Sequence, residues 1–392
     1  MWDLDVIEKS TYISFEHQIK QIISQLCGRK VAVWGASIRG MIAGVVLEEC
    51  GISTFEYIDS DIEKQGNLLS GHVIIPFNPN DRTVTILISM ENQSSVKKVL
   101  EESGWEENED FFCLVSSDVD ELMVQIKTLK NYRHLLLGAS CLHAVPLEER
   151  KENDLSEMIR DRSKESFKIL GLSCMGMKVM YYLLILESMI NHQIYSLGII
   201  VSWETLTSFH HLLPRTQKPA LVKRILEYAE ECSFFSLYES LLEEYKIAKE
   251  RVEDYILEKR YSINTMKENN KSTLKDYLDK GLMEPLDMNC EEIQYLIKIL
   301  DFAIKKGIDT TIIVEPIDMK LCRSLYGKQF DERYMNKCRA VENLAKKYRA
   351  HFINASDILS GESIVSKHTA NEAFYFEGRC KLAELIVDAS TD

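Results

Sequence analysis

The chain has 392 residues and a formal net charge of −14, with 45% hydrophobic and 28% charged residues. This length predicts two domains, each large enough to bury its own core. The acidic balance argues against nonspecific binding to nucleic acid or to an anionic membrane surface, because both require a basic face. It does not exclude a phosphorylated ligand, since a helix N-terminus can hold phosphate without lysine.

The cysteines and the apolar segments indicate a cytoplasmic protein. None of the ten cysteines has the Cys-x-x-Cys spacing or the nearby histidines of a zinc site, so we expect reduced, buried thiols and no metal. The first ten residues, MWDLDVIEKS, lack the apolar region of a signal peptide. The longest apolar stretch, near 179–190, contains Glu187 and is too short to span a membrane.

The first third of the chain alternates short apolar runs with helical segments. Helices are predicted at 15–27, 38–50 and 94–103 from their apolar spacing. Strands are predicted at KVAVW (30–34), STFEYID (53–59), HVIIP (72–76), TVTILIS (83–89) and FFCLV (111–115). This alternation predicts an α/β domain over residues 1–130, in which helices cover both faces of a parallel sheet.

A second alternation predicts another α/β domain over residues 131–392. Its strands are expected at HLLLG (134–138), KILGL (168–172), SLGIIVSW (196–203), TTIIVEP (310–316) and HFINAS (351–356). Helices are expected at 176–190, 338–348 and 378–389. The stretch from about 215 to 290 is rich in Glu, Lys, Leu and Tyr and has no strand-like run, so we expect a helical insertion that acts as a lid or an oligomer contact.

A glycine-containing turn follows the first predicted strand. In VAVWGASIRGMIAG, residues Gly35, Ser37 and Gly40 take the three small-residue positions of a G-x-G-x-x-G turn. Such a turn lets a phosphate approach the N-terminus of the next helix. Asp59 closes the following strand, where a carboxylate can bind ribose hydroxyls. The pattern predicts a Rossmann-like nucleotide site, although Ser37 replaces the middle glycine; the alternative is a Rossmann-shaped domain that binds no ligand.

The segment 28–80 resembles the small Rossmann domain of bacterial glycan-modifying proteins, among them sugar O- and N-acyltransferases. The resemblance is carried by WGAS-x-x-G, F-x-Y-I-D-S-D, K-Q-G and G-H-V-I-I-P. It implies a nucleotide-linked sugar or a regulatory nucleotide as the ligand of Gly35, Ser37, Gly40 and Asp59, with NAD(P) as the lesser option.

The second domain resembles the SGNH (GDSL-like) hydrolases and acyltransferases, which have a three-layer, flavodoxin-like fold. HLLLGASCLHAVP places Ser140 directly after a buried strand, where open α/β sheets bind ligands. LGLSCMGMKVM resembles the second block of that superfamily, and IIVSWETLT and IIVEPIDMKL resemble later segments. The resemblance implies that Ser140 is a nucleophile and that Gly176 contributes to an oxyanion hole.

Two positions depart from the SGNH pattern. Glu204 stands where the third block has an asparagine, and Asn371 and Phe374 stand where the closing D-x-x-H motif falls. The general base is therefore missing from its expected place. His368 is the nearest substitute, and His210 and His211 are further candidates. The remaining loop histidine, His143, is interpreted as a surface residue.

These observations predict acyl-ester transfer or hydrolysis on a sugar used for a bacterial surface glycan, with Ser140, Gly176 and His368 as the catalytic residues. The missing D-x-x-H motif favours an alternative, a non-catalytic protein that binds a glycan or a nucleotide-linked sugar. A third hypothesis is an NAD(P)-dependent oxidoreductase using Asp59, but the first domain, residues 1–130, contains no Tyr-x-x-x-Lys pair. Expected partners are a small molecule or a glycan, and neither a nucleic acid nor a membrane.

Overall fold

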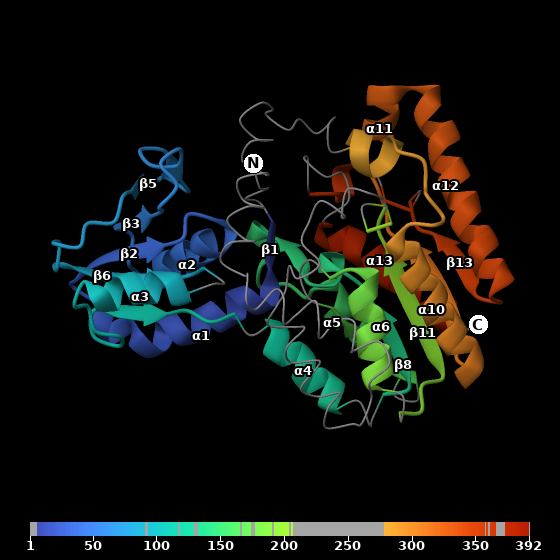
Figure 1. Ribbon diagram of the computed structural model, residues 1–392, viewed down its shortest axis with the longest axis horizontal. Helices are drawn as coiled ribbons and strands as arrows, with labels where there is room; N and C mark the ends of the chain where they lie inside the picture. Colours follow the sequence, from blue (N-terminus) through green and yellow to red (C-terminus); the bar gives the residue numbers. More distant parts are fainter. Residues whose placement is uncertain are drawn as a thin grey trace. The chain divides into compact units, whose positions relative to one another are not determined.

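The computed structural model describes residues 6–90, 93–116, 118–128, 132–164, 167–173, 177–189, 192–203, 205–206, 278–356, 358–359, 361–365 and 373–391. The chain divides into two compact units, residues 2–118 and 119–392, and both are α/β (Figure 1). The division falls before the boundary expected at 130. Helix α4 (Asp118–Thr128) accounts for the difference, because Val119, Leu122 and Ile126 are part of the core of the second unit.

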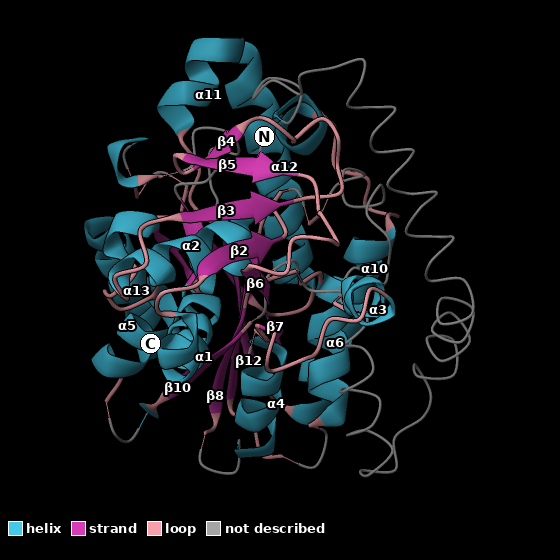
Figure 2. Ribbon diagram, turned by 90° about the vertical axis from the view of Figure 1, so that its left-hand side faces the viewer, coloured by secondary structure: helices cyan, strands magenta, loops and turns pink. Residues whose placement is uncertain are grey.

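The first unit is built around one six-stranded sheet. Its elements are β1 (Val6–Glu8), α1 (Lys9–Leu26), β2 (Lys30–Trp34), α2 (Ile38–Glu49), β3 (Phe55–Ile58), β4 (Leu68–Leu69), β5 (His72–Ile75), β6 (Val84–Ile88), α3 (Ser94–Glu102) and β7 (Phe111–Cys113). The sheet order is β4-β5-β3-β2-β6-β7 (Figure 2), and all neighbours are parallel except β4 and β5. Its parallel strands follow the Rossmann order 3-2-1-4-5, which switches direction between β2 and β6.

Alternation of side chains explains how this sheet is covered. Trp34 of β2 and Ile86 of β6 point to one face and pack with Val96 and Leu100 of α3. Helix α2 approaches β3 closely through Gly44. A Cβ atom at that position would lie 2.2 Å from the Tyr57 hydroxyl, so a larger residue would push the helix away.

The second unit contains a five-stranded parallel sheet. Before the gap at 207–277 come α4, β8 (His134–Leu137), the 3-10 turn η2 (Ser140–Leu142), β9 (Ala144–Pro146), η3 (Leu147–Glu149), α5 (Leu155–Arg162), β10 (Ile169–Leu172), α6 (Val179–Ser188) and β11 (Ser196–Val201). After it come the π-helical turn η6 (Asp279–Met283), α10 (Glu291–Lys306), β12 (Asp309–Val314), α11 (Met319–Tyr326), α12 (Lys328–Lys347), β13 (His351–Asn354), η7 (Gly361–Ser363) and α13 (Phe376–Thr391).

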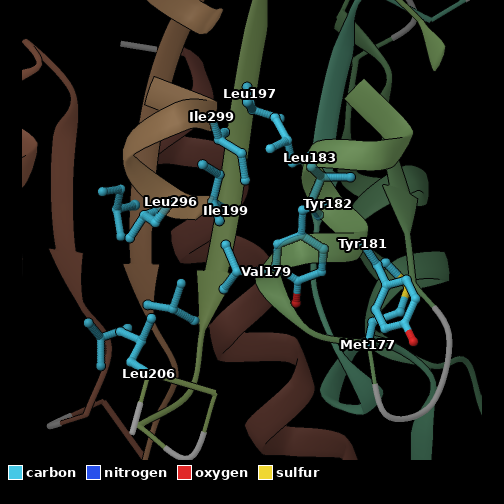
Figure 3. Packing of buried hydrophobic residues seen from close by; sticks show 14 of the residues in the cluster. Met177, Val179, Tyr181, Tyr182, Leu183, Leu197, Ile199, Leu206, Leu296 and Ile299 are labelled. Atoms are coloured by element: carbon cyan, nitrogen blue, oxygen red, sulfur yellow. The ribbon is translucent and has the colours of Figure 1, made fainter. Parts of the chain in front are cut away.

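The strand order β10-β8-β11-β12-β13 corresponds to 2-1-3-4-5, the flavodoxin-like arrangement. Leu135 and Leu137 of β8 point to the face covered by α4, α6, α10 and α12. Leu136 points to the opposite face, which α5 and α13 cover. Figure 3 shows Val179 of α6, Ile199 of β11 and Leu296 of α10 in the first of these layers. The predicted three-layer α/β class is therefore confirmed.

Each strand expected from an apolar run has a counterpart in the two sheets. The expected helical insertion at 215–290 lies mostly outside the described residues; its last part, 278–290, contains η6 and no strand. Within the described ranges, no helix combines the length and the apolar character needed to cross a membrane.

Candidate functional site

Ser140 lies at the carboxyl end of β8. The strand ends at Leu137, Ala139 is extended, and half-buried Ser140 begins the η2 turn. A Cβ atom on Gly138 would lie 2.7 Å from the Leu142 side chain, so glycine lets the turn fold back over the strand. Because β8 neighbours β11 at the point where the strand order reverses, Ser140 occupies the edge at which such sheets bind ligands.

His143 closes the same turn and contacts a carboxylate. Its backbone N–H donates to the Ser140 carbonyl at 2.9 Å. This hydrogen bond closes the η2 turn, so Ser140 and His143 lie at its two ends. The His143 ring Nδ1 lies 2.9 Å from Oδ2 of Asp154, and the two side chains are 17% and 7% exposed. The interpretation of His143 as a surface residue is therefore wrong.

Asp154 is held in place by the start of α5. Its Oδ1 accepts from the backbone N–H of Glu157 at 2.8 Å, and Glu157 Oε2 accepts from the backbone N–H of Asp154 at 3.0 Å. The N-terminus of a helix favours a negative charge on such a cap. An ionised carboxylate only accepts, so the His143 Nδ1 must donate to it. In a neutral imidazole the lone pair then lies on Nε2, which is the form of a general base.

Cys141, next to Ser140, is a protected thiol. It is 2% exposed and donates a hydrogen bond to the Glu315 carboxylate. Burial, reinforced by the negative charge of Glu315, raises the pKa of the Cys141 thiol well above its usual range. A thiol that stays protonated is a poor nucleophile. Of these two adjacent residues, half-buried Ser140 is therefore the better candidate nucleophile.

Polar residues follow four strands of the second sheet at this edge and are buried: Ser173 after β10, Ser202 after β11, Glu315 after β12 and Ser356 after β13. Ser202 is engaged locally, since its carbonyl accepts from the Thr205 hydroxyl at 2.8 Å. Within the described ranges the Ser173 hydroxyl has no hydrogen-bond partner. The side chains within the strands are mostly apolar and pack into the two cores. The buried polar side chains named above therefore lie at the carboxyl ends of the strands.

Glu292, at the start of α10, lies beneath this edge. Its carboxylate accepts from the backbone N–H groups of Met180 and Val179 and so caps α6. Burial raises the pKa of Glu292 to about 7, partly offset by the positive charge of Lys178. Among the described residues, Glu292 Oε2 has no hydrogen-bond partner. Burial, together with Cys141, Glu315 and Glu292, also raises the pKa of Tyr182, whose ring and hydroxyl Figure 3 shows beside Val179.

Arg379 of α13 braces the loop that carries Asp154. Its guanidinium bonds Glu149 Oε2 at 2.9 Å, the Asn153 carbonyl at 3.0 Å and the Phe374 carbonyl at 2.6 Å. The Arg379 side chain is fully buried, and the described residues offer no partner for its Nη2. These contacts hold residues 149–154 in place and thereby fix the carboxylate that meets His143.

Several of the residues predicted from sequence lie outside the described residues. Gly176 and His368 are among them, as are Glu204, His210, His211 and Asn371. Phe374, at one position of the missing D-x-x-H motif, is fully buried. Sequence reasoning missed Asp154, Glu315 and Arg379. The D-L-S-E pattern at 154–157 is a helix-start signature that could have located Asp154, whereas the partners of the other two depend on tertiary contacts.

In the first unit, Gly35, Ser37 and Gly40 come together between β2 and α2. Gly35 has a positive φ of 114°, and a Cβ atom on Gly40 would lie 2.0 Å from the Gly35 carbonyl oxygen. Both glycines are therefore required by the turn itself. Ser37 is the N-cap residue of α2, but its side chain makes no capping hydrogen bond.

Asp59 lies beside this turn, and its carboxylate is already bonded. Oδ2 accepts from the Ala36 N–H at 3.0 Å and from Lys64 Nζ at 2.9 Å, while Oδ1 accepts from the Asp61 N–H at 2.9 Å. Lys64 Nζ also donates to the Ala36 carbonyl at 3.1 Å. Lys64, which belongs to the K-Q-G segment, is thus a further residue of this site.

The described parts of the chain contain no group of three or more His, Cys, Asp and Glu side chains able to hold a metal ion. A scan against models of known protein families finds no match, and a search of curated proteins finds no relative. Fold alone does not specify function, which depends on the residues of the two sites.

Proposed function

We propose that the second unit transfers or hydrolyses a small acyl ester on a sugar used for a bacterial surface glycan, with Ser140 as the nucleophile. The observation that carries the proposal is the position of Ser140 at the switch point of the sheet, three residues before a histidine that is oriented by a buried carboxylate. The sugar is suggested by the resemblance of residues 28–80 to glycan-modifying proteins.

In the proposed reaction, Ser140 Oγ attacks the acyl carbonyl while His143 Nε2 takes the hydroxyl proton. Asp154 orients the ring and stabilises the imidazolium that forms. The Ser140 backbone N–H, together with Gly176, stabilises the oxyanion. Collapse of this intermediate releases the first alcohol, which takes the proton from His143. Water or a sugar hydroxyl then attacks the acyl-serine, giving hydrolysis or transfer. His368 remains the competing candidate for the base.

The first unit would supply or sense the activated sugar. Its turn at 35–40, with Asp59 alongside, suits a nucleotide or a nucleotide-linked sugar better than a hydride-transfer cofactor, because the unit itself contains no Tyr-x-x-x-Lys pair. We expect micromolar or weaker affinity. Calorimetric titration with nucleotide-linked sugars and NAD(P) tests this role, and folded protein that gives no heat with any of them would contradict it.

Kinetics of the full chain on an acetyl ester test the chemistry. Ser140→Ala should lower kcat by at least roughly 10³-fold, and His143→Ala should do nearly as much. His368→Ala discriminates between the two bases: if it is the more damaging variant, the base is His368. Cys141→Ser is the matched control, since it changes the adjacent residue and keeps a donor for Glu315. Activity that survives Ser140→Ala unchanged would remove the nucleophile assignment.

A second candidate function is a non-catalytic module that binds a glycan or a nucleotide-linked sugar. The substitution of Asn371 and Phe374 in the D-x-x-H positions favours it. It predicts that the wild-type protein shows no turnover above background, that Ser140→Ala is silent in that assay, and that sugar binding survives both in the wild type and in the variant.

A further inference from the structure

The turn of the first unit is closed by a network centred on Ala36. Its N–H donates to Asp59 Oδ2 at 3.0 Å, and its carbonyl accepts from Lys64 Nζ at 3.1 Å. Lys64 Nζ and Asp59 Oδ2 are themselves 2.9 Å apart. Lys64 lies in the turn that follows β3, so the chain folds back and places an ammonium group over the carboxyl ends of β2 and β3.

The donors already present limit what else Asp59 can bind. An ionised carboxylate has about four lone-pair positions. The Ala36 N–H, the Asp61 N–H and Lys64 Nζ fill three of these. The two vicinal hydroxyls of a ribose would bring two more donors, one more than the carboxylate can take.

Lys64 is the donor that can leave. The other two donors are backbone groups whose positions are set by the glycine turn and by the end of β3. The Lys64 ammonium is on a flexible stem, and its side chain is 41% exposed, against 13% for Asp59. Its departure would cost little, because a half-exposed ion pair is worth little to stability.

We propose that Lys64 is a specificity-determining residue of the nucleotide site: it occupies Asp59 in the ligand-free unit, and a ligand with both ribose hydroxyls displaces it. The inference rests on the proposed role of this unit in binding a nucleotide. It predicts that the ligand-free turn is preformed and self-bonded, and that binding exchanges the Lys64–Asp59 ion pair for hydrogen bonds from the ribose.

Calorimetry on the full chain tests the displacement, using UDP and ADP and their 2′,3′-dideoxy analogues as probes. Lys64→Met should bind the ribonucleotides about two- to fivefold more tightly than the wild type, since that factor corresponds to a half-exposed ion pair. The dideoxy analogues should show no gain, because they offer Asp59 no hydroxyl. Lys64→Gln, which is also uncharged but keeps a donor near the Ala36 carbonyl, should show the same gain even if Lys64→Met loosens the turn.

Lys97→Met is the matched control. It removes an ion pair with Glu107 in the same unit and touches neither Ala36 nor Asp59, so the affinity should stay at the wild-type value. Equal affinity in the wild type and both Lys64 variants would overturn the displacement and leave nucleotide binding intact. Weaker binding by both variants would make Lys64 a ligand contact and overturn it as well. If none of the proteins binds any probe, the nucleotide proposal itself fails.

Discussion

The thiol of Cys141 donates a hydrogen bond to the carboxylate of Glu315, which follows β12, whereas Cys141 follows β8. Strand β11 lies between these two strands in the sheet, so the hydrogen bond spans the end of the central strand. The turn that presents Ser140 is therefore attached to the middle of the sheet. Both members of this pair are buried, and Glu315 helps to keep the Cys141 thiol protonated.

Cys141 should resist thiol reagents in the native protein. Burial and Glu315 keep the thiol protonated, and only the thiolate reacts. Iodoacetamide followed by peptide mapping should label Cys27, which is exposed, and leave Cys141 unlabelled until the protein is denatured. Labelling of Cys141 in the folded chain at the rate of Cys27 would contradict the protected-thiol assignment and would reopen the choice of nucleophile.

Two substitutions of Asp154 should separate its contribution to stability from its contribution to catalysis. Asp154→Ala removes the cap of α5 and should cost about 0.5–2 kcal/mol in the free energy of unfolding. Asp154→Asn keeps an oxygen for the Glu157 N–H, so its stability should stay near that of the wild type. Both variants lose the carboxylate that orients His143, and kcat should fall by about 10²- to 10⁴-fold. Urea unfolding and ester kinetics measure the two effects; an Asn variant with full activity would exclude the orienting role.

Glu292 should make the second unit less stable at alkaline pH. Its pKa is raised from 4.5 in the unfolded chain to about 7 in the fold, mainly by burial, with Lys178 and Glu291 acting in opposite directions. The neutral form is therefore favoured, so this contribution to stability is complete below about pH 4.5 and is lost as pH rises through 7. The loss amounts to about 3 kcal/mol.

Glu292→Gln should abolish that dependence, because the amide oxygen can still accept from α6 and does not ionise. Urea unfolding of the wild type and the variant from pH 5 to 8.5 gives the difference directly. The variant should gain stability relative to the wild type as pH increases. Asp301→Asn, at an exposed position of the same helix, serves as the control. A constant difference across this range would show that Glu292 does not titrate there.

Gly40→Ala should unfold the turn at residues 35–40, because the new Cβ atom would meet the Gly35 carbonyl oxygen at 2.0 Å. We expect a loss of about 3 kcal/mol or more from such overpacking. Gly51→Ala, just beyond the other end of α2, has open space around it and a positive φ of 87°, so about 1–2 kcal/mol of backbone strain is expected. Hydrogen exchange of the β2 and β6 amides compares the two variants. Similar exchange in both would contradict the steric argument.

The strands could be predicted from the sequence because each is a short apolar run bounded by turn residues. KVAVW and TVTILIS, for example, fall on β2 and β6 within a residue. The end of each strand then located Ser140 and Asp59 at sheet edges. The domain boundary was harder, because the apolar face of α4 does not reveal which core it joins.

The side-chain partners could not be predicted in the same way. The His143–Asp154 pair is close in sequence, yet nothing in the sequence indicates that the ring turns toward the α5 cap rather than toward solvent. Glu315 and Cys141 are brought together only by the strand order of the folded sheet. The same holds for Lys64. The K-Q-G segment is part of a sequence pattern, but the contact between Lys64 and Ala36 forms only because the turn after β3 folds back.

The contact between Arg379 and Glu149 joins residues 230 positions apart. A chain synthesised from its N-terminus exposes β8 and the Ser140 turn long before α13 leaves the ribosome, and contacts of such separation form slowly. Until α13 docks, the loop at 149–154 lacks its brace, and Asp154 is held only by the capping box at the start of α5. We therefore expect the first unit to mature first during translation, with the loop between Ser140 and Asp154 acquiring its final form only as the last step of folding.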